Sequence, residues 1–151
     1  MDVGVYSDTG AESEVEVLQA KYPATIVSFD SAYFYYDMTD YIPETYTLVT
    51  GNHAKPIKDD RIRQFYVPEN VLDVGKTIIE YEDAKIRIYD KERLLIETAR
   101  MKNRLPSDQY KEIVAYYRAH VDEIEGGKIS EYLELFPHRD RILSIIDTEV
   151  F

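Results

Sequence analysis

The stretch that decides the fold is VSFDSAYFYYDMTDYIP, which runs from Val27 to Pro43. Aromatic and small apolar residues in its first half have helical spacing, and Ser28 stands where a hydroxyl can cap the free N–H groups of the first turn. Thr39 and Asp40 then favour a turn because their short side chains bond to nearby backbone. Pro43 lacks the N–H that a continuing helix needs. We therefore predict a short, tyrosine-rich helix that ends in a polar turn.

Strand patterns follow this helix. Apolar and polar residues alternate over residues 46–50 and again over residues 62–67, which predicts two strands. The segments 76–81 and 85–89 alternate in the same way around Glu82-Asp83-Ala84, which predicts a hairpin. At least four strands are expected in the first half of the chain.

Helical patterns are found before the strands and in the second half of the chain. A capping box at residues 9–12 predicts an early helix, and Asp90 is a candidate N-cap for a helix that Pro106 ends. A longer apolar stripe runs from Tyr110 to Ile124, and Gly126-Gly127 has the composition of a helix C-cap. Two shorter helical patterns follow, one on each side of Pro137.

This order of elements indicates the fold class. Strands in the first half and helices in the second favour an α+β fold, with a mostly antiparallel sheet of four or more strands and a helical C-terminal half packed on it. We expect residues 1–151 to form a single domain, because no linker-like or low-complexity segment divides them.

Composition restricts the classes of function. The chain has no cysteine, so we expect no disulfide or thiolate metal site and a cytoplasmic location. No apolar run is long enough to span a membrane, and the first residues do not form a signal peptide, so we expect no membrane partner. The net charge of −11 opposes nonspecific binding to the phosphates of DNA.

The basic residues are concentrated in the middle of the chain. Residues 51–104 hold twelve of the eighteen Lys and Arg side chains. The densest cluster consists of Lys55, Lys58, Arg61 and Arg63. One interpretation is a solvated loop and edge strand, in which alternating arginines discourage pairing with another chain. The alternative is a contact with a partner or a nucleic acid.

Catalytic motifs are not recognisable. Asp73, Glu80, Glu82 and Lys85 loosely resemble a metal-dependent nuclease, but Glu82 and Lys85 are separated by a turn and would not share a strand face. The three histidines lack the spacing of metal ligands, and the sequence has neither a nucleophile elbow nor a glycine-rich phosphate loop. We expect no catalytic residue, no metal and no cofactor.

The sequence nevertheless resembles a known family on four motifs in register between Val27 and Asp108, among them the strand at residues 46–50 and the segment FYVPENVLDVG from Phe65 to Gly75; the other two hold the motif residues. The first is S-x-x-S-A followed by T-D-x-x-P, formed here by Ser28, Ser31, Ala32, Thr39, Asp40 and Pro43. The second is KIRIYDKERLLIETARMKNRLPSD, from Lys85 to Asp108, which includes Asp90 and Glu92. These motifs are similar to the AbiEi-type antitoxins of abortive-infection E systems. We expect the motif residues themselves to have structural roles.

The resemblance implies a function and partners. It implies a noncatalytic antitoxin or regulatory domain of a phage-defence toxin–antitoxin system, which counters a nucleotidyltransferase-like toxin. The alternative is a transcriptional regulator of the toxin–antitoxin operon that touches DNA through residues 55–63 and 85–104, although such contact would be weak without a winged helix. Relatives carry an N-terminal winged helix-turn-helix, so residues 1–8 would be a remnant strand of that missing module.

Overall fold

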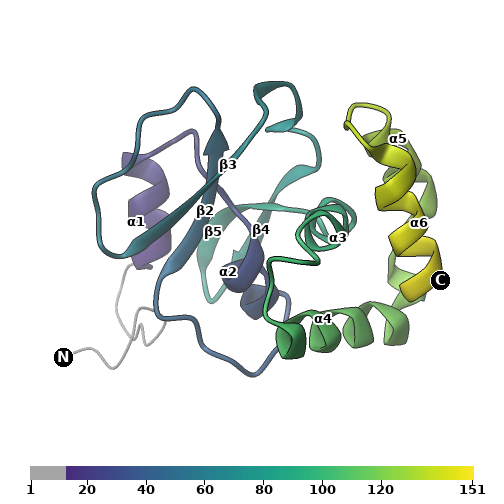
Figure 1. The fold of residues 1–151 in the computed structure, drawn as a ribbon. Helices are drawn as coiled ribbons and strands as arrows, with labels where there is room; N and C mark the ends of the chain where they lie inside the picture. Colours follow the sequence, from purple (N-terminus) through teal and green to yellow (C-terminus); the bar gives the residue numbers. More distant parts are fainter. Residues whose placement is uncertain (1–12) are drawn as a thin grey trace. The chain divides into compact units, whose positions relative to one another are not determined.

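A computed structural model describes residues 13–151 of the chain. These residues form an α+β fold with one five-stranded sheet and six α-helices, as Figure 1 shows. The chain divides into two compact units, the first ending at Tyr89 and the second comprising Asp90–Phe151. All five strands belong to the first unit. The predicted α+β class is therefore confirmed.

The first unit contains the sheet and two helices. Its elements are α1 (Glu14–Lys21), β1 (Ile26–Val27), α2 (Phe29–Tyr35), β2 (Tyr46–Gly51), β3 (Ile62–Val67), the 3-10 turn η1 (Glu69–Val71), β4 (Lys76–Tyr81) and β5 (Ala84–Tyr89). The predictions of β2, β3 and the β4–β5 hairpin are confirmed. The predicted capping box at residues 9–12 and the predicted remnant strand at residues 1–8 lie outside the described residues.

The sheet is mixed, so the prediction of a mostly antiparallel sheet is wrong. Its strand order is β3-β2-β1-β5-β4. The pairs β1–β2 and β4–β5 are antiparallel, whereas β2–β3 and β1–β5 are parallel. Residues 52–61 return the chain to the start of β2, which places Tyr46 opposite Ile62 and Gly51 opposite Val67. This return connection produces a parallel pair where a tight turn would have produced an antiparallel one.

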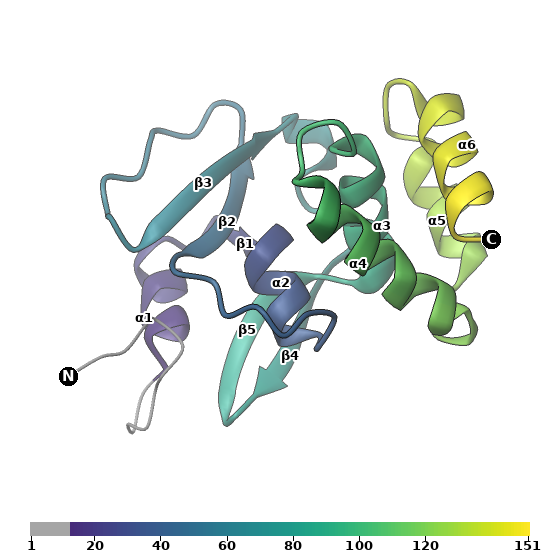
Figure 2. The same cartoon turned by 60° about the horizontal axis from the view of Figure 1, so that its bottom comes forward.

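The two helices of the first unit contact opposite faces of the sheet. Side chains alternate between the faces along a strand, and on β2 the neighbours Tyr46 and Thr47 reach different helices. The Tyr46 hydroxyl donates to Oε1 of Glu14 in α1 at 3.3 Å, whereas Thr47 is bonded to Ser31 of α2. Figure 2 shows α2 lying over the sheet, with the hairpin of β4 and β5 beside it.

The hairpin has a tight turn. Glu82 and Asp83 have φ angles of 48° and 69°, and Ala84 already belongs to β5. Two successive residues with positive φ are typical of a type I′ turn, whose twist matches that of the strands. The hairpin is therefore one residue tighter than the predicted turn.

The second unit is helical. Its elements are α3 (Lys91–Arg100), α4 (Ser107–Ala119), the 3-10 turn η2 (Val121–Glu123), α5 (Gly126–Leu133) and α6 (Arg139–Glu149). Residues 92–99 of α3 are all buried, and α3 contacts both α5 and α6. None of the helices described between residues 13 and 151 is long and apolar enough to cross a membrane.

The glycine pair has a different place from the one predicted. Gly126 and Gly127 begin α5, so their predicted role as the C-cap of the preceding helix is wrong. Helix α4 ends at Ala119, and Ile124 then has extended backbone with φ −108° and ψ 127°. This extended residue ends the helical path before the chain reaches the glycines.

Candidate functional site

The first candidate site lies where β1, α2 and β2 meet. It is built from the hydroxyl groups of Ser28, Ser31 and Thr47, all buried. The Ser31 N–H donates to the Thr47 hydroxyl at 2.9 Å, and the Thr47 N–H donates to the Ser31 hydroxyl at 2.9 Å. The Thr47 hydroxyl in turn donates to the Ser28 carbonyl. These reciprocal bonds attach the start of α2 to β2.

The predicted capping role of the Ser28 side chain is wrong. Ser28 occupies the N-cap position of α2, but its hydroxyl makes no capping bond and is buried without a hydrogen-bond partner. The next residue, Phe29, has a φ of 55°, a backbone conformation uncommon for residues other than glycine. Thr47 instead accepts the bond from a first-turn N–H of α2, so the cap comes from a neighbouring strand.

The other members of the first motif also have local roles. Ala32 is fully buried in α2. The Thr39 hydroxyl accepts a bond from the Tyr41 N–H at 3.1 Å, which stabilises the predicted turn. Asp40 and Pro43 lie in the following segment, between α2 and β2. This motif therefore joins a helix to a strand.

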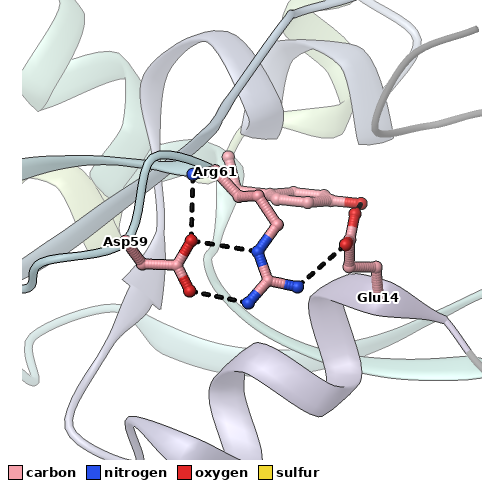
Figure 3. Close-up of polar contacts among 4 residues, drawn as sticks. Glu14, Asp59 and Arg61 are labelled. Atoms are coloured by element: carbon pink, nitrogen blue, oxygen red, sulfur yellow. Dashed lines mark hydrogen bonds and ion pairs between the residues drawn. The ribbon is translucent and has the colours of Figure 1, made fainter. Parts of the chain in front are cut away.

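The basic cluster of the middle region lies at and before β3. Arg61 forms ion pairs with two carboxylates, as Figure 3 shows: its Nε and Nη2 donate to the two oxygens of Asp59 at 2.9 and 2.6 Å, and its Nη1 donates to Glu14 at 2.9 Å. The hydrogen bonds from the Arg61 side chain and N–H hold the pKa of Asp59 at about 2, below its ordinary 3.8. The side-chain hydrogen bonds that Arg61 donates to Asp59, followed by the one it donates to Glu14, raise the pKa of Arg61.

The remaining cations of this cluster are more exposed. The Arg63 guanidinium lies 5.0 Å from the centre of the Phe65 ring, a cation–π contact along the strand. Lys55 and Lys58 are exposed in the loop before β3. The structure thus places two carboxylates on Arg61, and contact of Lys55, Lys58, Arg61 or Arg63 with a partner stays a prediction.

The motif residues of the second unit anchor helices. Asp90 accepts the Arg93 N–H at 2.8 Å, which confirms it as the N-cap of α3, and its other oxygen accepts the Tyr132 hydroxyl at 2.6 Å. Desolvation and this bond to Asp90 raise the pKa of Tyr132. Glu92 accepts the Glu125 N–H at 2.9 Å, just before α5. Both carboxylates therefore hold α3 and α5 together.

Helix α3 also carries a buried ion pair. The Arg93 Nε donates to Glu97 at 3.0 Å, and both side chains are 0% exposed. Arg100 donates to the other Glu97 oxygen at 2.9 Å, and the Arg93 guanidinium lies 4.8 Å from the centre of the Phe136 ring. This arrangement satisfies both carboxylate oxygens within the unit.

Comparison with known families decides the affiliation of the chain. Residues 59–146, more than half of the sequence, match the family described as nucleotidyl transferase of unknown function (DUF2204). The chain belongs to this family. In comparison with curated proteins, the chain shows no match.

Membership of the nucleotidyltransferase family overturns the resemblance to the antitoxins. The antitoxin function, with its roles in phage defence and in regulation of a toxin–antitoxin operon, is therefore wrong. The first motif lies entirely before residue 59, outside the matched segment. Its residues build a helix–strand junction and a turn, and Asp90 and Glu92 hold helix starts. Such structural roles recur in many folds, so these motifs do not by themselves identify the antitoxin family.

Nucleotidyl transfer raises the question of a metal ion. Phosphoryl transfer is commonly assisted by divalent cations, which carboxylates and substrate phosphates hold together. Within residues 13–151, no three His, Cys, Asp or Glu side chains converge to hold a metal ion. At the β1–α2–β2 junction the side chains are hydroxyls bonded to one another and to backbone. The described residues therefore provide no site with three such protein ligands for a divalent cation.

Sequence reasoning missed the residues that connect distant elements. Thr47 lies in a strand pattern, where nothing indicates that its hydroxyl caps a helix sixteen residues earlier in the chain. Arg93 and Glu97 are four residues apart on a predicted helix, a spacing that signals an ion pair. That signal could have identified the pair, although not its complete burial.

Proposed function

We propose that this chain is a noncatalytic member of the nucleotidyltransferase family, which acts by binding and not by nucleotidyl transfer. The observation that carries the proposal is the engagement of four carboxylates in ion pairs and a helix cap. Asp59 and Glu14 pair with Arg61, Glu97 pairs with Arg93, and Asp90 caps a helix. Acidic side chains that already pair with an arginine or cap a helix are poor candidates for metal ligands, because a metal ion would have to displace those partners.

The chemistry of transfer makes this observation relevant. A nucleotidyl group passes through a transition state whose negative charge must be stabilised by cations or hydrogen-bond donors arranged in advance. At the β1–α2–β2 junction, the Thr47 and Ser31 hydroxyls already bond to each other's backbone N–H groups. A substrate phosphate there would have to compete with bonds that hold the fold. The absence of cysteine from the sequence favours a cytoplasmic setting for this binding function.

A transfer assay tests the proposal. The purified chain is incubated with each nucleoside triphosphate labelled at the α-phosphate, with Mg²⁺ or Mn²⁺, and with a mixed RNA and protein pool as acceptor. We expect no labelled acceptor. We also expect the chain to release no more pyrophosphate than a heat-denatured sample of the same chain.

The matched variants are Glu80→Gln and Asp73→Asn. Glu80 lies opposite Lys85 on the hairpin, and Asp73 pairs with Lys76 at 3.1 Å. Both acids belong to the segment that loosely resembles a metal-dependent nuclease. Metal-dependent transfer by the chain that is lost in either variant, with the melting temperature unchanged, would overturn the noncatalytic proposal.

A further inference from the structure

A cavity of about 240 Å³ lies on the α1 side of the sheet in the first unit. Its lining residues come from α1 and the β4–β5 hairpin: Glu16, Gln19, Ala20, Ile78, Lys85 and Arg87. None of these residues belongs to the β1–α2–β2 junction or to the Arg61 cluster. The cavity is therefore separate from the sites described above.

The strand register brings the charged residues of this cavity together. Lys85 and Arg87 are two residues apart on β5, so both side chains leave the same face of the sheet. The neighbouring strand places Ile78 opposite Arg87 and Glu80 opposite Lys85. Ile78 is 65% exposed, which shows that α1 leaves this part of the face uncovered. Two cations thus stand beside an open apolar side chain.

Arg87 is held firmly, but only by neutral groups. Its Nε donates to the Thr25 carbonyl at 2.7 Å, and its Nη2 donates to the Gln19 carbonyl at 3.5 Å. The buried Gln19 side chain bonds to both the N–H and the carbonyl of Arg87, each at 2.9 Å. Among residues 13–151, no carboxylate forms an ion pair with Arg87, and burial lowers its pKa. A guanidinium in this state carries a charge that its surroundings do not balance.

The cavity lining holds two cations, Lys85 and Arg87, and one carboxylate, Glu16. Lys85 is exposed and contributes a second cation without an ion pair in the described part of the chain. The carboxylates nearby are Glu16, whose side chain accepts the Lys85 N–H at 3.3 Å, and Glu80 on the facing strand. An exposed ammonium beside a hydrogen-bonded guanidinium is an arrangement suited to a tetrahedral oxyanion, because the guanidinium gives direction and the ammonium gives charge.

We propose that this cavity binds the phosphate group of a small phosphorylated ligand, with Arg87 and Lys85 as the recognising cations. A volume of about 240 Å³ lies just under the lower limit of ~300 Å³ for sites that enclose a whole small molecule, so the cavity takes the phosphate end and leaves the remainder of the ligand outside. The inference rests on the geometry of the cavity. It holds whether or not the chain transfers nucleotides.

The test is a titration of the complete chain with inorganic phosphate, followed by the amide NMR resonances of residues 85–87. We expect a saturable shift in the wild type. Lys85→Gln should weaken the Kd by about ten-fold, since a hydrogen bond to a charged group is lost. Glu16→Gln should tighten it by about two- to five-fold, because a facing negative charge disappears while the acceptor for the Lys85 N–H is kept. Acetate at equal concentration should shift these resonances less than phosphate.

The matched control is Lys111→Gln, which makes the same change in net charge at an exposed lysine of α4 that does not line the cavity. It should leave the Kd unchanged. Arg87→Gln should abolish saturation, but its backbone bonds make a loss of folding an alternative cause, so the Lys85 and Glu16 variants decide. The proposal is overturned if phosphate leaves residues 85–87 unshifted, or if Lys111→Gln weakens binding as much as Lys85→Gln. Nucleotidyl transfer would overturn the proposed function without affecting this result.

Discussion

Each unit of the molecule holds an arginine that is paired with a carboxylate, yet the two arrangements differ in their exposure to water. In the first unit, Arg61 bridges Asp59 and Glu14, and its side chain is 43% exposed. In the second unit, Arg93 and Glu97 are 0% exposed. The distances are similar, at 2.6 to 3.0 Å. The comparison teaches that contact geometry alone does not determine the energetic importance of an ion pair, because desolvation has to be included.

The strongest way to break this comparison is Glu97→Gln. The variant keeps the shape of the side chain but leaves the buried Arg93 charge without its counter-charge. We expect the free energy of unfolding to fall by about 3–5 kcal/mol, as is typical when one partner of a buried pair is removed. Urea denaturation monitored by circular dichroism measures the change.

A double variant serves as the control for this prediction. Replacing the pair with Arg93→Met and Glu97→Leu should restore much of the lost stability, because both fully buried charges are removed and the remaining charge, on Arg100, is 29% exposed to water. A loss below about 1 kcal/mol for Glu97→Gln would show that the pair behaves like a surface pair and would remove the contrast between the units.

The buried hydroxyl groups of the β1–α2–β2 junction carry no charge, so they show how much burial alone contributes to the cost of losing a polar contact. Thr47→Val removes the hydroxyl that accepts the Ser31 N–H and donates to the Ser28 carbonyl. We expect a loss of about 1–3 kcal/mol, since buried polar groups are left without partners. Thermal and urea denaturation of the chain measure it.

Ser28→Ala is the matched control for this network. It deletes a hydroxyl that is equally buried but has no hydrogen-bond partner. Its free energy of unfolding should stay within about 0.5 kcal/mol of the wild type, or rise. An equal loss in both variants would mean that the hydrogen bonds of the Thr47 hydroxyl do not account for its effect on stability.

Elements that depend on local pattern were predictable, and pairings between distant segments were not. The alternation over 76–89 predicted a hairpin, and Asp90 predicted a helix start, because both signals lie within a few residues. The parallel pairing of β2 with β3 depends on the path of residues 52–61, which local alternation does not encode. Strand β1 has only two residues, too few to show a period.

The candidate sites divide in the same way. The cluster around Arg61 was visible in the sequence as neighbouring cations, but its neutralisation by Glu14 joins residues forty-seven positions apart. The cavity at Arg87 needs both the hairpin register and the contact of α1 with β5. Propensity and period describe single elements, so a site formed between elements appears only when the sheet order is known.

The smallest expected effect belongs to Asp59→Asn, which removes a carboxylate from the exposed Arg61 cluster. We expect a loss of less than about 1 kcal/mol that shrinks in high salt, as for other surface pairs. The folded-state pKa of Asp59 is about 2, below its ordinary 3.8, so its stabilising charge is present above pH 3.8 and is lost as the pH falls toward 2. The difference in unfolding free energy between wild type and variant should therefore be nearly constant well above pH 3.8, shrink as the pH falls from 3.8 through 2, and disappear below pH 2. Urea denaturation at a series of pH values measures this difference, and a gap that persists unchanged at pH 2 would show that Asp59 stabilises the chain by its shape and neutral hydrogen bonds, contrary to the ion-pair interpretation of the first unit.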